Sequence, residues 1–218
     1  MLFVWYKVSF DEKWSHGSAV CETVYFFVEF VCVFPWKCVS LNNQNRGKIM
    51  DGILRKLPIG IQTFEKLREG DYLYVDKTAL VWRIASTETP YFLSRPRRFG
   101  KSLLLSTFEA YFEGKKELFE GLAIADMEKE WKTYPLFHLD LNAEKYDSPQ
   151  ALVEILSRQL TQWELKYGKG EDEETLSGRF AGVIRRACEQ SGRGVVVLVD
   201  EYDKPLLQAL GDDALLDD

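Results

Sequence analysis

The chain has 218 residues, 46% of them hydrophobic, so it is long enough to bury the core of one domain. Its formal net charge of −6 and its pI near 5.2 exclude a broadly basic surface of the kind that coats nucleic acid. The cysteines Cys21, Cys32, Cys38 and Cys188 lack the spacing of metal ligands, which argues against a zinc site. Scattered thiols are typical of a reducing compartment, so we predict a cytoplasmic location.

The first 49 residues differ in composition from the rest, since they hold three of the four cysteines and three of the six tryptophans. Their apolar run from Val24 to Trp36 is too short to span a membrane and carries Glu29 near its middle, so we expect no membrane partner. We predict that residues 1–49 are an extension outside the functional domain and that residues 50–218 form that domain.

Strand and helix patterns alternate after Met50. Tyr72–Val75 is expected to be a short strand, with Asp76 as the N-cap of the next helix. A second strand over Tyr91–Ser94 leads through a loop into a helix that starts at Gly100. Strand, loop and helix therefore follow one another in the order that a phosphate-binding loop requires.

The second half continues the alternation and ends on a run of aliphatic residues typical of a strand buried on both faces. The expected elements are a strand over Leu136–Leu141, a helix that begins at Pro149 after Ser148 as N-cap and ends before Gly168, a helix over Leu176–Cys188, and a strand over Val195–Val199.

The first chemical motif is the sequence RPRRFGKS over residues 95–102, which matches the second half of the pattern GxxxxGK[ST]. In such a loop the backbone N–H groups surround the phosphates, the lysine reaches their oxygens and the hydroxyl binds Mg²⁺. Arg95 stands where the pattern has its first glycine, and the arginines could instead bind neighbouring carboxylates as a solvated cluster. The predicted nucleotide-binding residues are Arg97, Arg98, Phe99, Gly100, Lys101, Ser102 and Leu103.

The second motif is the pair Asp200-Glu201 at the end of the buried strand, where ligands of open α/β sheets bind. We predict that Asp200 and Ser102 hold Mg²⁺, and that Glu201 and Lys101 are catalytic, with Glu201 deprotonating the attacking water. The alternative is a core strand that ends in an acidic turn. A glutamate next to the aspartate favours hydrolysis over transfer to a substrate.

The two motifs stand among further stretches that match one family pattern, namely Pro58–Ile61, Phe64, Leu67-Arg68, Tyr74–Thr78, Phe92–Leu103 and Asp200–Leu206. Taken together, over about residues 53–210, they resemble the bacterial AAA-ATPase-like P-loop proteins. The resemblance implies that ATP is the nucleotide, that Arg95 is a tolerated member of the loop, and that a restriction-endonuclease-like nuclease domain commonly follows.

The predicted fold is α/β, a P-loop NTPase-like three-layer sandwich with a mostly parallel sheet. The resemblance also implies a further strand that inserts between the strands of the two motifs. Residues 202–218 are too few for that strand and its crossover helix. We therefore expect a chain truncated after the second-motif strand, an N-terminal fragment that hydrolyses ATP poorly by itself.

Several other polar residues have two interpretations each. Tyr74, Asp76 and Lys77 match the family and would approach the base or ribose, or else they serve packing and helix capping. Asp140 would support Mg²⁺ or end its strand as a cap, and the cap is favoured. His138 is expected to be a core histidine rather than an acid or base.

Three functions from different classes follow. The first is an ATP-binding module whose Mg²⁺-dependent hydrolysis drives or gates an attached effector. The second is a switch that binds the nucleotide and works through conformation without fast turnover. The third is an inactive, truncated fragment. The sequence leaves self-association, nucleic acid binding and the effector itself open.

Overall fold

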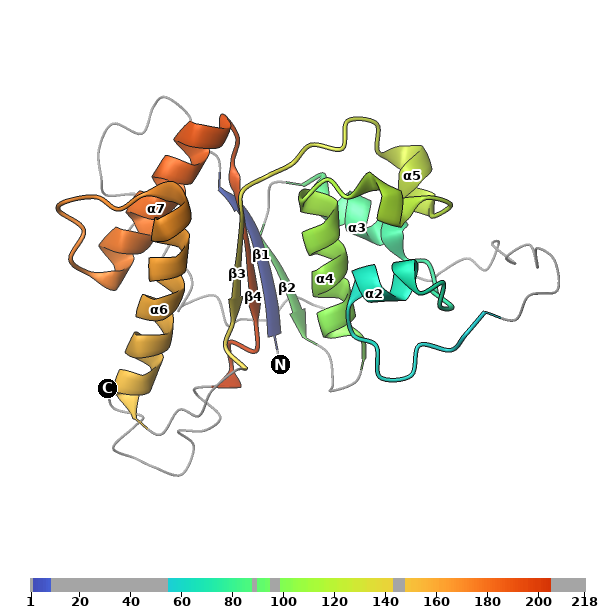
Figure 1. Cartoon of the computed structure of the whole chain (residues 1–218), viewed down its shortest axis with the longest axis horizontal. Helices are drawn as coiled ribbons and strands as arrows, with labels where there is room; N and C mark the ends of the chain where they lie inside the picture. The colour runs from blue at the N-terminus through green and yellow to red at the C-terminus, as the bar shows by residue number, and fades with distance from the viewer. Residues whose placement is uncertain (1, 9–54, 88–89, 95–98, 143–147, 205–218) are drawn as a thin grey trace.

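The structure of the chain is a computed structural model that describes residues 2–8, 55–87, 90–94, 99–142 and 148–204 (Figure 1). One sheet lies between two groups of helices, with α2 to α5 on one face and α6 and α7 on the other (Figure 1). The elements in chain order are β1 (Leu2–Val8), α2 (Phe64–Glu69), α3 (Thr78–Ala85), β2 (Tyr91–Ser94), α4 (Lys101–Phe112), the 3₁₀ helix η1 (Lys116–Phe119), α5 (Ala123–Met127), β3 (Leu136–Asp140), α6 (Pro149–Tyr167), α7 (Leu176–Ser191) and β4 (Val195–Asp200).

The strand order of the sheet is β2-β1-β4-β3. β3 and β4 are parallel, with Asp140 opposite Asp200, whereas β1 is antiparallel to both of its neighbours. Since β2 and β4 are both antiparallel to β1, they run in the same direction, and β3 is parallel to β4. All three strands therefore end at one edge of the sheet. The fold is thus mixed α/β with a small parallel sheet interrupted by one antiparallel strand.

β1 occupies the place between the two motif-bearing strands, where the resemblance implied a strand from beyond Asp200. Its register sets Leu2 opposite Ser94 of β2 and Phe3 opposite Asp200 of β4. Residues 9–54, including the apolar run from Val24 to Trp36, lie outside the described residues. The assignment of residues 1–49 to an extension outside the functional domain therefore stays a prediction, and β1 is the part of that extension whose position is described.

Most of the expected elements are confirmed. β2 has the predicted bounds, and β4 extends the predicted strand by one residue to Asp200. α6 begins at Pro149, and the hydroxyl of Ser148 accepts a hydrogen bond from the N–H of Ala151 at 3.3 Å, as the capping pattern indicated. α7 runs on to Ser191 and ends at Gly192, which adopts a left-handed φ of 64°.

The strand expected at Tyr72–Val75 is wrong. This segment makes one isolated parallel bridge, between Lys56 and Tyr72, and a single bridge does not continue into a ladder. The next helix begins at Thr78, and Asp76 caps it from two residues before, where its carboxylate accepts from the N–H of Thr78 at 2.8 Å. The short helices α2, α5 and η1 were not predicted, because four to six residues carry too little periodicity to recognise.

β4 lies at the centre of two cores, one on each face of the sheet. Its Val196 and Leu198 belong to the cluster under α2 to α5, which includes Phe64, Phe108 and Phe119. The alternate residues Val195, Val197 and Val199 belong to the cluster under α6 and α7. All six residues of β4 are buried, as its aliphatic run predicted, and this double burial fixes the strand that carries Asp200.

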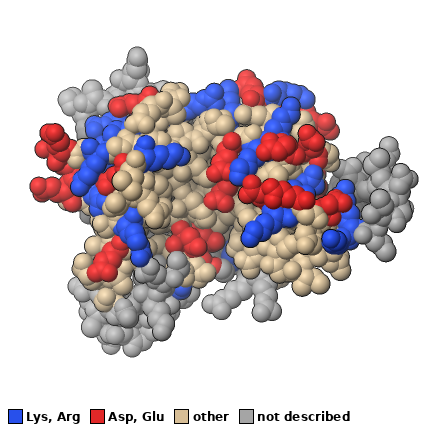
Figure 2. Space-filling model, in the orientation of Figure 1, with Lys and Arg blue, Asp and Glu red and all other residues tan. Residues whose placement is uncertain are grey.

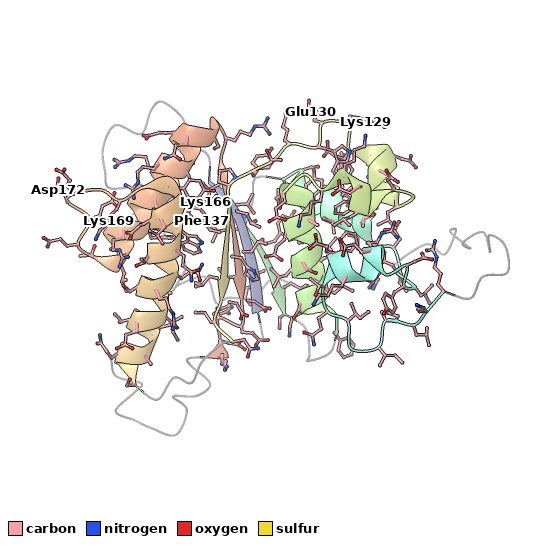
Figure 3. The ribbon with its side chains drawn as sticks, viewed as in Figure 1. Lys129, Glu130, Phe137, Lys166, Lys169 and Asp172 are labelled. Carbon is pink, nitrogen blue, oxygen red and sulfur yellow. The ribbon has the colours of Figure 1, made fainter. Side chains whose placement is uncertain are left out.

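The α6 side of the sheet is held by aromatic packing. Phe137 of β3 points toward α6 (Figure 3), where its ring stacks on that of Trp163 with centroids 4.7 Å apart. In the face shown by Figure 2, basic and acidic side chains are interspersed over both helical groups. Within the described residues, no helix combines the length and the apolar character needed to cross a membrane.

Candidate functional site at the carboxyl edge of the sheet

The two sequence motifs meet at one edge of the sheet. β2, β3 and β4 end there, and the N-terminal end of α4 lies at the same edge (Figure 1). A helix N-terminus presents unpaired N–H groups and a partial positive charge, which together attract anions. The edge thus combines a feature that attracts phosphate with the carboxylates that end β3 and β4.

Lys101 is the first residue of α4 and is only 5% exposed. Its ammonium interacts electrostatically with the carboxylates of Asp200 and Glu201, and each interaction favours the ionised carboxylate. A buried lysine needs such partners, because desolvation of an isolated ammonium is costly. The structure therefore places Lys101, Asp200 and Glu201 in one group of interacting charges.

Gly100 sets the direction in which α4 leaves the preceding loop. Its φ of 74° lies in the left-handed region, where a side chain is strained even though the space around its missing Cβ is open. Phe99 is 62% exposed, and Ser102 and Leu103 are half-buried in the first turn of α4. Arg97 and Arg98, like the rest of residues 95–98, lie outside the described residues.

Asp200 is a buried carboxylate with an unsatisfied oxygen. It is 8% exposed, and its Oδ1 is buried without a hydrogen-bond partner among the described residues. Burial, followed by the negative charge of neighbouring Asp140, raises the pKa of Asp200, while the N–H of Glu201, His138 and Lys101 oppose that rise. A bound cation would stabilise a carboxylate that is buried, has an unpaired oxygen and lies beside a second negative charge.

Glu201 follows in a conformation that is rare for a glutamate. Its φ is 57°, in the left-handed region, and a non-glycine residue there costs of order 1 kcal/mol. It is 8% exposed, and burial and the adjacent Asp200 raise its pKa. A raised pKa moves a carboxylate toward the range in which it can accept a proton from water near neutral pH.

Near this edge, a pair of side chains, His138 and Glu109, lies between β3 and α4. Of the two, only His138 was singled out from the sequence. The Nδ1 of His138 is 2.7 Å from a carboxylate oxygen of Glu109 on α4. Burial alone would lower the pKa of His138. The hydrogen bond to Glu109 and the negative charges of Glu109, Asp140 and Asp200 outweigh the effect of burial, so the pKa is raised. No sequence pattern pointed to Glu109, because its partner lies across the interface between α4 and the sheet.

Asp140 ends β3 as a cap. Its Oδ1 accepts from the N–H of Asn142 at 2.8 Å, which closes the turn after the strand. The same residue faces Asp200 in register and contributes negative charge at the edge. The favoured interpretation as a strand-terminal cap therefore agrees with its hydrogen bonding.

The family-matching residues of the 74–78 segment hold the fold together. Besides capping α3, the carboxylate of Asp76 accepts from the N–H of Ala123 at 2.7 Å and so also caps α5. The hydroxyl of buried Thr78 accepts from the N–H of Ile124 at 3.1 Å. The ring of Tyr74 packs edge-on against Phe64, and burial raises the pKa of Tyr74 to about 12. Capping and packing account for Tyr74 and Asp76.

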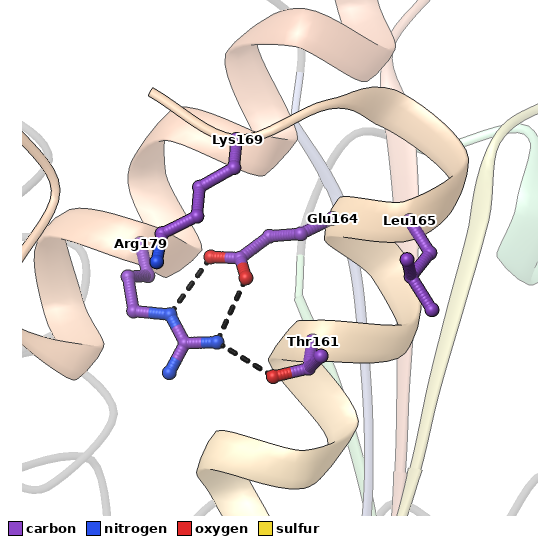
Figure 4. Close-up of a pocket in the computed structure, with 5 residues that line it drawn as sticks. All are labelled: Thr161, Glu164, Leu165, Lys169 and Arg179. Atoms are coloured by element: carbon purple, nitrogen blue, oxygen red, sulfur yellow. Dashed lines mark hydrogen bonds and ion pairs between the residues drawn. The ribbon is translucent and has the colours of Figure 1, made fainter. Parts of the chain in front are cut away.

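A separate cavity of about 360 Å³ lies between α6 and α7, away from the sheet edge (Figure 4). The guanidinium of Arg179 there binds both oxygens of Glu164 at 2.8 Å and also Thr161 at 2.9 Å. This cavity therefore surrounds a structural ion pair and is not the place where the two motifs converge. Its lining residues are Thr161, Glu164, Leu165, Lys169 and Arg179.

The oxygen donors at the sheet edge fit a hard divalent cation. Mg²⁺ is bound in proteins by one or two carboxylates or hydroxyls together with water and phosphate oxygens. Asp200 with its unsatisfied Oδ1, and Ser102 in the first turn of α4, are donors of this kind. Within the described residues there is no group of three or more His, Cys, Asp or Glu side chains arranged to hold a metal ion.

Comparison with known proteins supports the resemblance. A family profile described as "Predicted AAA-ATPase" matches residues 58–218, which is most of the chain. The chain belongs to this AAA-ATPase-like family. It is also 44% identical over 157 residues to the "uncharacterized protein in vnfD 5′ region" of Azotobacter chroococcum mcd 1. That match covers 72% of this chain but 30% of the relative, so the chain spans under a third of the relative's length. No solved structure matches significantly.

Proposed function

We propose that this AAA-ATPase-like chain is an ATP-binding P-loop module that uses Mg²⁺ and, with the remainder of a longer protein, hydrolyses ATP to drive or gate an attached effector. The observation that carries the proposal is the buried Lys101 at the N-terminus of α4, electrostatically coupled to Asp200 and Glu201 at the end of β4. Membership of a family described as predicted AAA-ATPases supports ATP as the nucleotide.

Each residue has a distinct task in this proposal. The backbone N–H groups at the start of α4 and the ammonium of Lys101 bind the β- and γ-phosphate oxygens. The hydroxyl of Ser102 and the carboxylate of Asp200 hold the magnesium ion, which neutralises phosphate charge when bound. Glu201 orients a water molecule and takes its proton as the water oxygen attacks the γ-phosphorus, while the bond to the β–γ bridging oxygen breaks to leave ADP and phosphate.

Hydrolysis is favoured over transfer to a substrate because of the position of Glu201. The left-handed backbone turns the chain directly after β4, and the N–H of Lys204 bonds back to the carbonyl of Glu201 at 3.0 Å. A strained residue at a functional site is retained where its placement matters. The carboxylate therefore stays next to Asp200 and Lys101, within the same group of charges.

Nucleotide binding and turnover are separable by two substitutions. Lys101→Ala should abolish the rise in melting temperature that Mg²⁺-ATP causes, since a ligand at a hundred times its Kd adds about 2.7 kcal/mol of stability. Glu201→Gln should keep that rise in melting temperature. The equivalent substitution in the full-length relative should abolish phosphate release, measured at steady state. Lys116→Ala is the matched control, because Lys116 is an exposed lysine beyond the far end of α4.

The outcomes distinguish the competing functions. A nucleotide switch predicts a different result. ATP binding would then depend on Lys101, but the longer protein would show no turnover that depends on Glu201. Mg²⁺-ATP that leaves the melting temperature of the wild-type chain unchanged would contradict the proposal.

A further inference from the structure

His138 and Glu109 are joined across the interface between β3 and α4, at the edge where the motifs meet. The Nδ1 of His138 lies 2.7 Å from Oε1 of Glu109, an ion pair or hydrogen bond that orients the imidazole ring. Both side chains are about 30% exposed, so the pair is shielded from solvent on most sides. A histidine held by a carboxylate at one nitrogen presents the other nitrogen in a defined direction.

The second ring nitrogen of His138 is not satisfied by hydrogen bonding within the described fold. Its Nε2 is buried and makes no hydrogen bond to any described residue. The Oδ1 of Asp200 has the same property. Buried polar atoms are nearly always paired, so two unsatisfied atoms in one neighbourhood point to a shared function.

The sheet register makes His138 and Asp200 neighbours on one face of the sheet. His138 stands opposite Leu198 in the parallel pair of β3 and β4, and Asp140 stands opposite Asp200. His138 is thus the diagonal neighbour of Asp200 on the face that also carries Leu198 toward α4. Diagonal neighbours on adjacent strands lie about 7–8 Å apart at the backbone, a separation that an imidazole and a carboxylate bridge through one water. Electrostatic coupling between His138 and Asp200 agrees with this proximity.

We propose that His138, oriented by Glu109, is a positioning residue that fixes the Asp200 carboxylate in the orientation needed to hold the magnesium of the bound nucleotide. This inference rests on the proposed function. The imidazole touches neither nucleotide nor metal, and it acts through the carboxylate. Partners that orient a metal ligand from behind typically contribute 10–100-fold to metal affinity.

The experiment measures how much Mg²⁺ the ATP-dependent thermal shift requires. At fixed ATP, Mg²⁺ is titrated and the concentration that gives half of the shift is recorded. His138→Ala and Glu109→Ala should each raise that concentration about tenfold or more. Glu109→Gln keeps an oxygen acceptor for Nδ1 and should stay near wild type. His138→Gln keeps a polar end group and serves as the second variant if His138→Ala does not fold.

Glu113→Ala is the matched control, since Glu113 is an exposed residue that follows α4 one turn after Glu109 and pairs with half-buried Lys115. A pair that only fastens α4 to the sheet would lower the melting temperature without nucleotide but leave the Mg²⁺ requirement unchanged, and that result would overturn the inference. The Lys101→Ala variant separates the two proposals. If it loses the ATP shift while the His138 and Glu109 variants keep the wild-type Mg²⁺ requirement, the nucleotide site stands and only the positioning role fails.

Discussion

At the scale of single residues, Asp200 combines a proposed metal-binding role with an electrostatic cost. It is buried beside Asp140 and Glu201, and burial is the first cause of its raised pKa. Replacing a destabilised functional residue commonly increases stability at the expense of activity. Asp200→Asn removes one of three neighbouring negative charges while keeping the size of the side chain.

We therefore expect Asp200→Asn to raise the melting temperature of the nucleotide-free chain at pH 7, by about 1 kcal/mol in stability, and to lose the Mg²⁺-dependent part of the ATP shift. Because the folded pKa of Asp200 is raised, the wild-type carboxyl takes up a proton as pH falls, so the advantage of the variant should shrink toward acid pH. Thermal melts across pH measure both effects.

Asp140→Asn is the control for that comparison, since an asparagine can still accept from the N–H of Asn142 and close the turn. It should relieve part of the repulsion yet retain the Mg²⁺ response. A nucleotide-free melting temperature that falls in Asp200→Asn would show that the carboxylate is stabilised by contacts that outweigh its burial.

At the scale of elements, α7 is held by two arginine–carboxylate pairs in addition to apolar packing, one to α6 and one to the loop that precedes α7. Arg179 and Glu164 are 12% and 6% exposed, and the guanidinium also donates to Ser157 at 2.7 Å. The second pair, Arg186 with Glu173, is similarly shielded. Gly182 makes room for it, because a Cβ there would lie 1.7 Å from a carboxylate oxygen of Glu173.

Breaking the first pair from one side should be costly. Glu164→Ala leaves the guanidinium of Arg179 buried without its carboxylate, for which we expect a loss of about 3–5 kcal/mol in urea unfolding. Replacing both partners together, as Glu164→Leu with Arg179→Met, should cost much less, because no uncompensated charge remains. Glu174→Ala, at an exposed acidic residue before α7, is the control. Equal losses in the single and double variants would contradict this account.

At the scale of the whole molecule, the spacing between the two motifs depends on β1. This strand pairs over four residues with β2 and over six with β4, and so joins the strand before the first motif to the strand that ends in Asp200. A proline within it removes a backbone N–H from a central ladder. Val4 lies in the stretch that pairs on both sides, opposite Phe92 and Val199.

Val4→Pro should therefore lower the melting temperature strongly and abolish the ATP shift together, because both flanking strands lose their register. Val4→Ala retains the N–H and should have the smaller effect. Hydrogen exchange of the β4 amides gives a second measurement, with protection lost in the proline variant. Unchanged stability and protection in Val4→Pro would show that β1 does not occupy the centre of the sheet in solution.

The elements near the site were predictable to different extents. β2, α6 and β4 were recognisable because each carries a local signal, namely a strand between turn residues, a capping serine before proline, and an uninterrupted aliphatic run. The segment over Tyr72–Val75 looked like a strand by composition, yet only one bridge forms, since pairing depends on a partner elsewhere in the chain.

By itself, the sequence determined the family and the candidate residues for phosphate and metal binding, because Gly100-Lys101-Ser102 and Asp200-Glu201 are local motifs whose chemistry is read in the order of the chain. Only the tertiary structure decided which groups surround them. The placement of β1 between β2 and β4 and the contact of Glu109 with His138 arise from pairing and packing between distant segments. Local patterns specify periodicity and side-chain chemistry, whereas the partner of a strand edge or of a buried polar atom is set by the whole fold.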